Sequence, residues 1–312
     1  MGGNVRGRFA PSPSGRMHIG NALSALLAWL SARAQGGQFV VRLEDLDERT
    51  RDPHAAEQLL DDLAWLGLDF DEEPLRQSEH LGRYGEALEQ LRQHAEVYEC
   101  FCSRADLHAA SAPHASDGGV LYAGTCYRLS EEQRAARRAR RKPALRLHVP
   151  AETVAFDDVH CGRFAQELAS ECGDFVVCRS DGVFAYQLVC VVDDAASGVT
   201  EVVRGDDLLS STPRQIHLQR LLGLPTPAYA HHPLLVDVQG RRLSKRDGDC
   251  DLGFVRQQVR GPEQLVGFLA ACAGLLDAYE PVRVGELVGE FSWERVAHGP
   301  IDVYGRAAAL GR

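Results

Sequence analysis

Strand-like and helix-like segments alternate at the start of the chain. Residues 4–10 and 38–45 are rich in β-branched and aromatic side chains and are typical of strands. Residues 21–34 and 54–66 carry apolar side chains at helical spacing, and Gly67 follows the second run as a helix stop. Strands that alternate with helices favour a parallel sheet with right-handed crossovers. We therefore expect an α/β fold built on a Rossmann-like parallel sheet.

This alternation is interrupted in the middle of the chain. Residues 98–172 contain shorter strand-like runs and a stretch rich in Gly, Ser and Ala, so we interpret them as an insertion that splits the sheet. The alternation resumes over residues 173–240, which should complete the Rossmann-like domain begun by residues 1–97. Residues 241–312 begin as a polar loop and continue with apolar side chains at helical spacing, which predicts a small helical C-terminal appendage.

The composition indicates a soluble protein of the cytoplasm. The chain has 312 residues, 45% of them hydrophobic, which is enough for a sizeable core. No apolar run reaches the roughly 20 residues that span a bilayer. A net charge of -10 argues against indiscriminate binding of nucleic acid, although residues 134–142 hold six basic side chains in nine positions. Either a contact with a phosphate backbone or a solvated helix face would explain that run.

Two polar strings could hold a nucleoside triphosphate from two sides. In the first string a Pro/Ser/Gly loop leads into a helix N-terminus that carries His18, Gly20 and Asn21. Helix N-terminal amides and a neutral imidazole can donate hydrogen bonds to phosphate oxygens. In the second string Ser244 and Lys245 lie in a polar loop, from which the lysine could reach a departing pyrophosphate. Each string alone would be an ordinary helix start or an exposed loop, so the prediction depends on their occurring together.

The nine cysteines do not describe a disulfide framework, but three of them have the spacing of metal ligands. Two are separated by one residue and the third follows across a Gly-rich stretch: Cys100, Cys102 and Cys126. This spacing is typical of zinc. On chemical grounds the fourth ligand would be His108 or His114, because the phenol of Tyr122 must lose a proton with a pKa of about 10 to ligate well.

The two polar strings resemble the HIGH and KMSKS signatures of class I aminoacyl-tRNA synthetases, with Asn21 in place of the last histidine of the first. The segments VRLEDLDERTRDP, CFCSR, YQLVCVVDD and VVRGDDLLSSTPRQ are similar to the glutamate-specific branch of that family. The resemblance implies that His18, Asn21 and Lys245 are catalytic and that ATP binds with Mg²⁺. It also implies that Tyr122 completes a structural zinc site.

The same resemblance implies a binding site for L-glutamate. Two arginines would meet the carboxylates, a glutamate would pair with the α-ammonium, a tyrosine would donate a hydrogen bond, and the loop after the first strand would complete the site. The residues at these motif positions are Arg8, Phe9, Ala10, Pro11, Ser12, Glu44, Tyr186 and Arg204.

The outline, which we expect to lack an anticodon-binding domain, resembles the glutamyl-queuosine tRNA(Asp) synthetase family. Members of that family activate glutamate without tRNA and transfer it to queuosine at the wobble position, so the implied partner is the anticodon arm of tRNA(Asp). We expect a monomer that does not bind membranes. The alternatives are the catalytic fragment of a conventional glutamyl-tRNA synthetase, or a non-catalytic paralogue that binds RNA or a nucleotide. Intact His18, Lys245, Arg8 and Glu44 favour an enzyme.

Overall fold

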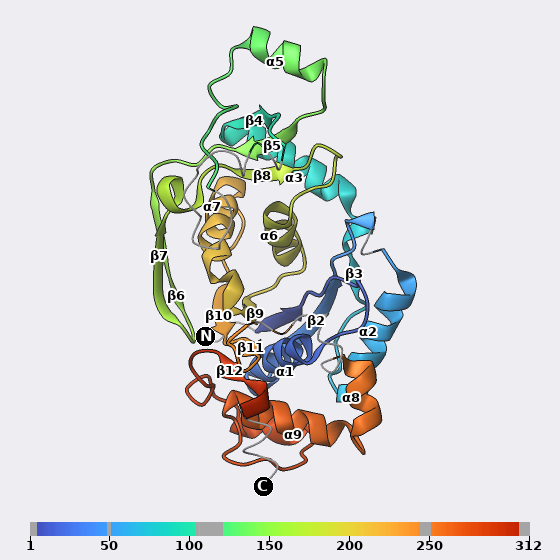
Figure 1. Cartoon of the computed structure of the whole chain (residues 1–312). Coiled ribbons are helices and arrows are strands. Elements are labelled where there is room, and N and C mark those ends of the chain that lie inside the picture. Colours follow the sequence, from blue (N-terminus) through green and yellow to red (C-terminus); the bar gives the residue numbers. More distant parts are fainter. Residues whose placement is uncertain are drawn as a thin grey trace.

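Five parallel strands form the central sheet in the order β10-β9-β1-β2-β3 (Figure 1). The computed structural model describes residues 5–48, 51–103, 106, 121–241, 243 and 251–305. In this sheet, β1 lies between β2 and β9. The expected α/β fold with a parallel sheet is therefore confirmed. The strand bounds are Arg6–Phe9 for β1, Gln38–Leu43 for β2, Leu75–Arg76 for β3, Glu201–Gly205 for β9 and Ala228–His232 for β10.

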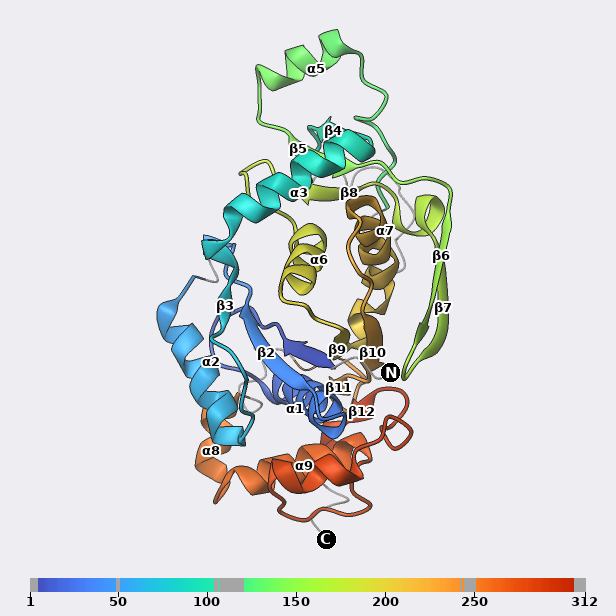
Figure 2. The ribbon, with the colours of Figure 1, turned by 180° about the vertical axis from the view of Figure 1, so that it is seen from behind.

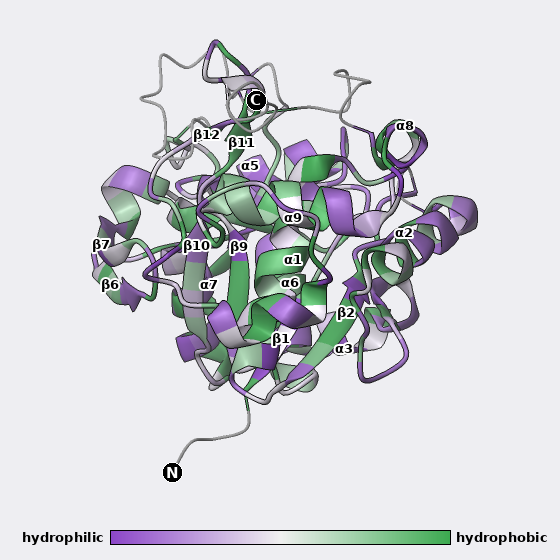
Figure 3. Cartoon of the chain, turned by 90° about the horizontal axis from the view of Figure 1, so that it is seen from below, coloured by the Kyte–Doolittle hydropathy of each residue, from purple (hydrophilic) through white to green (hydrophobic). Residues whose placement is uncertain are grey.

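Helix α1 (Ile19–Ala34) follows β1 and buries most of its residues. It packs on β1, β2 and β9 and also against the 3₁₀ helix η6 (Val284–Glu290). Being covered by several elements explains why its sequence is apolar on almost every side rather than along one stripe. Figure 3 shows α1 as a hydrophobic helix in the middle of the molecule, with hydrophilic residues on peripheral helices such as α2 (Pro53–Leu66).

The two faces of the sheet carry separate hydrophobic cores. Because side chains alternate along a strand, Val203 and Ala230 pack with α1 on one face, whereas Val202 and Tyr229 belong to the core on the other face. The second face is covered by three helices, α3 (Leu81–His94), α6 (Tyr186–Ala196) and α7 (Thr212–Leu222) (Figure 2). The sheet is thus buried on both sides, as parallel sheets require.

Local capping explains the bounds of α2. Asp52 is the N-cap, and its side chain accepts a hydrogen bond from the His54 amide, while Pro53 occupies the first turn. At the other end Gly67 has a φ of 79°, a left-handed conformation that glycine adopts without strain. The helix therefore ends where the sequence predicts.

The insertion contains two antiparallel sheets. One pairs β4 (Val97–Cys100) with β5 (Ala144–Leu147) and β5 with β8 (Phe175–Cys178). The other is a long hairpin of β6 (Thr153–Asp158) and β7 (Gly162–Glu167), followed by the short π-helix η3 (Leu168–Cys172). Strand β8 lies beyond residue 172, where we expected the parallel alternation to resume. It pairs with β5 instead, because its apolar residues complete the insertion sheet.

The C-terminal part is mainly helical and returns to the sheet domain. Helices α8 (Leu252–Gln258) and α9 (Pro262–Ala273) precede η6, and α9 packs against α2. A short parallel pair then joins β11 (Leu235–Val236) to β12 (Ile301–Asp302). Across the described residues, no helix combines the length and apolar character needed to cross a membrane.

Candidate active site

A pocket opens at the carboxyl ends of β1 and β9, beside the N-terminus of α1. The chain proceeds from β1 to β2 and β3 on one side, whereas β9 and β10 lie on the other side of β1. Such a switch point is where open parallel sheets bind ligands. Of the residues expected to bind substrates, those that line this pocket are Arg8, Phe9, Ala10, Pro11, His18, Gly20, Asn21, Glu44, Tyr186 and Arg204.

Arg8 is held in the pocket wall by a buried charge network. Its Nε lies 3.4 Å from Asp194 Oδ1, and its Nη1 donates to the Val203 carbonyl at 3.1 Å. Asp194 also accepts from Arg42, which in turn donates to Glu44 Oε1 at 3.2 Å. Burial opposes ionisation of Asp194, yet Arg42 and Arg8 hold its pKa below the usual value. Burial raises the pKa of Glu44, against the opposing effect of Arg42.

Arg204 is fixed by three side chains and also lines the pocket. Its Nε donates to His231 Nε2 at 3.0 Å, its Nη1 to Tyr186 Oη at 3.2 Å, and its Nη2 to Thr212 Oγ1 at 2.8 Å. Burial raises the pKa of Tyr186, so its phenol keeps its proton. Because the oxygen of Tyr186 accepts from Arg204, that proton can be donated to an acceptor in the pocket.

The start of α1 presents hydrogen-bond donors to the pocket. His18 is the N-cap, and its Nδ1 accepts from the Gly20 amide at 3.1 Å. The neutral ring therefore carries its proton on Nε2. A Cβ on Gly20 would lie 2.9 Å from the His18 ring. The absence of a side chain at Gly20 therefore makes room for the imidazole of His18.

The segment with Ser244 and Lys245 lies outside the described residues, but both of its ends are close to the pocket. Leu243 lines the pocket. At the other end Asp251 forms a β-bridge with His18, and the Leu252 amide donates to the Met17 carbonyl at 2.9 Å. The chain thus leaves the pocket wall just before Ser244 and returns beside His18.

One residue predicted to bind glutamate does not line the pocket, and several residues in or behind the pocket wall had no predicted role. Ser12 is exposed and is not part of the pocket wall. The buried residues behind the wall, Arg42, Asp194 and His231, were not assigned roles, and neither was His232, which lines the pocket. Two adjacent histidines at the carboxyl end of a predicted parallel strand are a pattern from which a position near the pocket could have been predicted. Burial lowers the pKa of His232 to about 4, so this ring is neutral.

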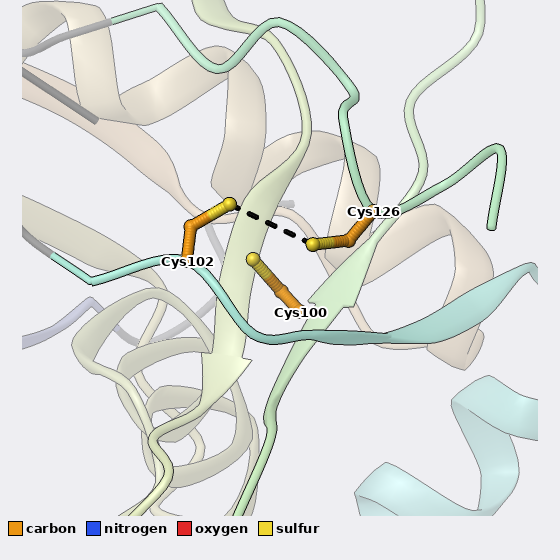
Figure 4. Close-up of side chains that lie close together, drawn as sticks. All are labelled: Cys100, Cys102 and Cys126. Atoms are coloured by element: carbon orange, nitrogen blue, oxygen red, sulfur yellow. Dashed lines mark hydrogen bonds between the residues drawn. The ribbon is translucent and has the colours of Figure 1, made fainter. Parts of the chain in front are cut away.

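The three predicted cysteine ligands lie together in the insertion. Their sulfur atoms are within 4.8 Å of one another and point toward a common centre (Figure 4). The Tyr122 oxygen lies 3.6 Å from Cys100 Sγ and 3.9 Å from Cys102 Sγ, and the Cys102 and Cys126 sulfurs are 3.6 Å apart. A tetrahedral zinc ion with bonds of about 2.3 Å separates its sulfur ligands by about 3.8 Å. The 3.6 Å separation of the Cys102 and Cys126 sulfurs is close to this value, and the three cysteines are near enough to one another to share one metal ion.

The surroundings of the cluster orient its ligand atoms. The Cys126 amide donates to the Tyr122 oxygen at 2.7 Å, and the Arg146 Nε donates to Cys100 Sγ at 3.3 Å. The Arg146 guanidinium also lies 4.0 Å from the centre of the Tyr122 ring. These donors favour negative charge on sulfur and oxygen, as bound zinc would. The alternative ligands His108 and His114 lie outside the described residues.

The chain is similar throughout its length to one synthetase family. Residues 4–292 match the family model for tRNA synthetases class I (E and Q), catalytic domain. A Symbiobacterium thermophilum protein named glutamyl-Q tRNA(Asp) synthetase is 50% identical over 95% of each chain. A Nocardia farcinica protein of the same name is 47% identical over 94% of this chain and 91% of its own length.

Glutamate–tRNA ligases are also similar to the chain. The ligase of Heliobacterium modesticaldum is 40% identical over 95% of this chain, which covers 62% of that protein. The crystal structure of a glutamate tRNA ligase from Elizabethkingia meningosepticum in complex with its amino acid superposes with a TM-score of 0.81 at 27% identity, over 98% of this chain and 68% of that one. The chain therefore belongs to the class I tRNA synthetases of the E and Q family, with relatives named glutamyl-Q tRNA(Asp) synthetase among those most similar to it.

Proposed function

We propose that this chain activates glutamate with ATP in the absence of tRNA and transfers it to queuosine at the wobble position of tRNA(Asp). The observation that carries the proposal is the pocket lined by both Arg8 and Arg204, on the neighbouring strands β1 and β9, together with Glu44 and Tyr186. The relatives' shared name supports the acceptor, since this chain covers 95% and 91% of two proteins so named but 62% of a glutamate–tRNA ligase.

Glutamate carries two anionic groups and one cationic group, and the pocket offers a partner for each. Arg8 and Arg204 bind the two carboxylates, Glu44 pairs with the α-ammonium, and the Tyr186 hydroxyl donates to a carboxylate oxygen. Phe9, Ala10 and Pro11 form the pocket wall beside Arg8, and exposed Ser12 lies in the loop that follows. The arginines and Tyr186 are already held by their neighbours, so little side-chain entropy is lost on binding.

ATP occupies the side of the pocket formed by the N-terminus of α1. His18 Nε2 and the side-chain amide of Asn21 would donate to phosphate oxygens, and Ser244 and Lys245 would supply contacts to the β- and γ-phosphates. A carboxylate oxygen of glutamate attacks the α-phosphorus, and pyrophosphate leaves with the bond electrons. Mg²⁺ bound to the triphosphate neutralises part of its charge. A hydroxyl of the queuosine cis-diol then attacks the activated carbonyl, loses its proton, and displaces AMP.

Zinc in the insertion has a structural role in this proposal. Cys100, Cys102, Tyr122 and Cys126 would hold it at the junction of β4 and the segment before α5 (Glu131–Arg138). Four protein ligands leave no open position for substrate. One chain supplies both the pocket and this site, so we propose that the enzyme acts as a monomer. We place its activity in the cytoplasm, where its tRNA is found.

Transfer to an isolated anticodon arm tests the acceptor. We expect radiolabelled glutamate to be transferred to a queuosine-bearing stem-loop of tRNA(Asp) that lacks the 3′-terminal CCA, because the modified base and not the terminal ribose accepts it. The matched control is the same stem-loop with guanosine at the wobble position, which should remain unlabelled. The observation in support of the alternative, conventional aminoacylation, is the likeness to glutamate–tRNA ligases. Charging of tRNA(Glu) that depends on the 3′-terminal adenosine would contradict our proposal and support this alternative.

Metal analysis tests the zinc site. The purified chain should contain about one zinc ion, and the Cys102→Ser/Cys126→Ser variant should contain none, because two thiolate ligands are removed. Cys161→Ser is the control, since that exposed cysteine lies outside the cluster. Tyr122→Phe should also weaken zinc retention, whereas His108→Ala and His114→Ala should not. Stoichiometric zinc in the double-serine variant would contradict the assignment.

A further inference from the structure

Helix α5 is a basic helix that buries none of its eight residues, Glu131–Arg138. Figures 1 and 2 show it standing out beyond the β4-β5-β8 sheet, at the end of the molecule opposite α9. An isolated helix of this length is unstable in water. Here a capping box helps to hold it, in which Ser130 and Gln133 exchange hydrogen bonds between side chain and backbone.

Three of the arginines in this region attach the helix to the cysteine module. Arg138 binds Glu99 at 2.8 Å and Glu131 at 2.7 Å. Arg134 Nη2 donates to the Tyr127 carbonyl at 3.3 Å, and Arg141 Nη1 donates to the Phe101 carbonyl at 2.9 Å. Their positive groups are therefore used to position the helix.

Three other cations of the same region remain directed to solvent. Arg137, Arg140 and Lys142 are exposed, and within the described part of the chain none of them has a side-chain hydrogen bond or ion pair. Arg140 lies in the turn just after the helix, where its amide donates to the Arg137 carbonyl at 3.0 Å and Ala139 keeps a right-handed helical conformation, so Arg137 and Arg140 lie about one turn apart. Between residues 128 and 142 the chain has seven basic and two acidic side chains, although its net charge is -10.

We propose that Arg137, Arg140 and Lys142 form a docking surface for RNA phosphates, which we call the α5 basic face. The apolar residues of α5 are alanines only, so the helix has no hydrophobic face to enter a membrane or the groove of a protein partner. The partner that is complementary to these three cations is therefore a polyanion. Resting on the proposed function, we assign the ligand as the tRNA backbone outside the anticodon loop, so that this contact adds affinity without selecting the base.

Salt-dependent binding of a tRNA(Asp) transcript tests this surface. The full-length Arg137→Gln/Arg140→Gln/Lys142→Gln variant should bind the transcript on the order of 10-fold or more weakly at low salt. The slope of log K against log salt should become shallower by about 2 to 3, one for each lost phosphate contact. Glutamate-dependent ATP–pyrophosphate exchange without tRNA should stay at the wild-type rate, because the pocket is untouched.

The control is the Arg92→Gln/Arg163→Gln/Arg220→Gln variant. These side chains are 46%, 67% and 50% exposed, and each is already paired with an acidic neighbour, so its binding should match wild type. A wild-type slope for the α5 variant would overturn the proposal, as would equally tight, α5-dependent binding of phosphatidylserine vesicles or polyglutamate. Because transcript binding requires no queuosine, failure of wild-type transfer would count against the proposed function and leave this test intact.

His231 links Arg204 to a carboxylate of the insertion. His231 is fully buried, and its Nδ1 lies 2.6 Å from Asp158 Oδ2. Asp158 Oδ1 also accepts from the amides of His160, Cys161 and His231, so this carboxylate is an anchored acceptor. His231 Nδ1 must therefore donate, which leaves the lone pair of Nε2 for the Nε–H of Arg204. Burial lowers the pKa of His231 and keeps the ring neutral.

We infer that Asp158 and His231 are positioning residues for Arg204, and hence for glutamate in the proposed function. Asp158 ends strand β6 of the insertion, so a residue outside the parallel sheet sets the tautomer of a histidine on β10. Replacing the carboxylate by an amide would present a donor to His231 Nδ1. The histidine would then carry its proton on Nε2, facing the donor of Arg204, and the guanidinium would have to move.

Kinetics of ATP–pyrophosphate exchange test this role. Asp158→Asn should raise the KM for glutamate on the order of 10-fold or more and change the KM for ATP less than about twofold. His231→Leu should raise the KM for glutamate to a similar extent. His231→Gln, which retains an acceptor for Arg204, should have a KM for glutamate much closer to that of wild type. An unchanged KM for glutamate, or equal rises for both substrates, would overturn the inference. Wild-type exchange with glutamate is measured first, so a failure of the proposed function is recognised separately.

Discussion

The ion pairs that Asp194 makes with Arg8 and Arg42 are the constraint on which the pocket depends. All three side chains are buried, and removing one partner from such a network typically costs about 3–5 kcal/mol because an uncompensated charge remains. The network joins β1, β2 and α6, so it fixes that helix against the sheet. Tyr186 begins the same helix, and it is thereby placed to contact Arg204 on β9. The pairing of these buried charges therefore helps to position the pocket side chains that we propose to bind glutamate.

The insertion belongs to the same arrangement and is not a loosely attached module. Its hairpin reaches the sheet domain through Asp158 and His231, and its three-stranded sheet carries the cysteine cluster and α5. A substrate that enters the pocket and also touches α5 would contact both domains. Such an arrangement suits a tRNA arm, whose base must be held closely and whose phosphates provide sequence-independent affinity.

Local sequence patterns predicted the parts of the structure that depend on local interactions. The strand–loop–helix from β1 to α1, the cap at Gly67 and the cysteine spacing follow from a few neighbouring residues, and the pocket residues occupied recognisable motif positions. Arg42, Asp194 and Asp158 could not be assigned in the same way, because their roles arise from contacts between residues far apart in the sequence. Strand β8 was likewise ambiguous, since an apolar run does not reveal whether its partner strand is parallel or antiparallel.

Glutamate-dependent exchange of labelled pyrophosphate into ATP by the purified chain, with no RNA present, tests most directly whether this pocket activates glutamate. Because the proposed site offers two buried arginines and a tyrosine hydroxyl to the two carboxylates of glutamate, we expect exchange that saturates with glutamate. Exchange with glutamine or aspartate should be weaker on the order of 100-fold or more, because each leaves buried polar groups unmatched. Exchange that requires added tRNA, or that proceeds equally with glutamine, would contradict the assignment of the pocket.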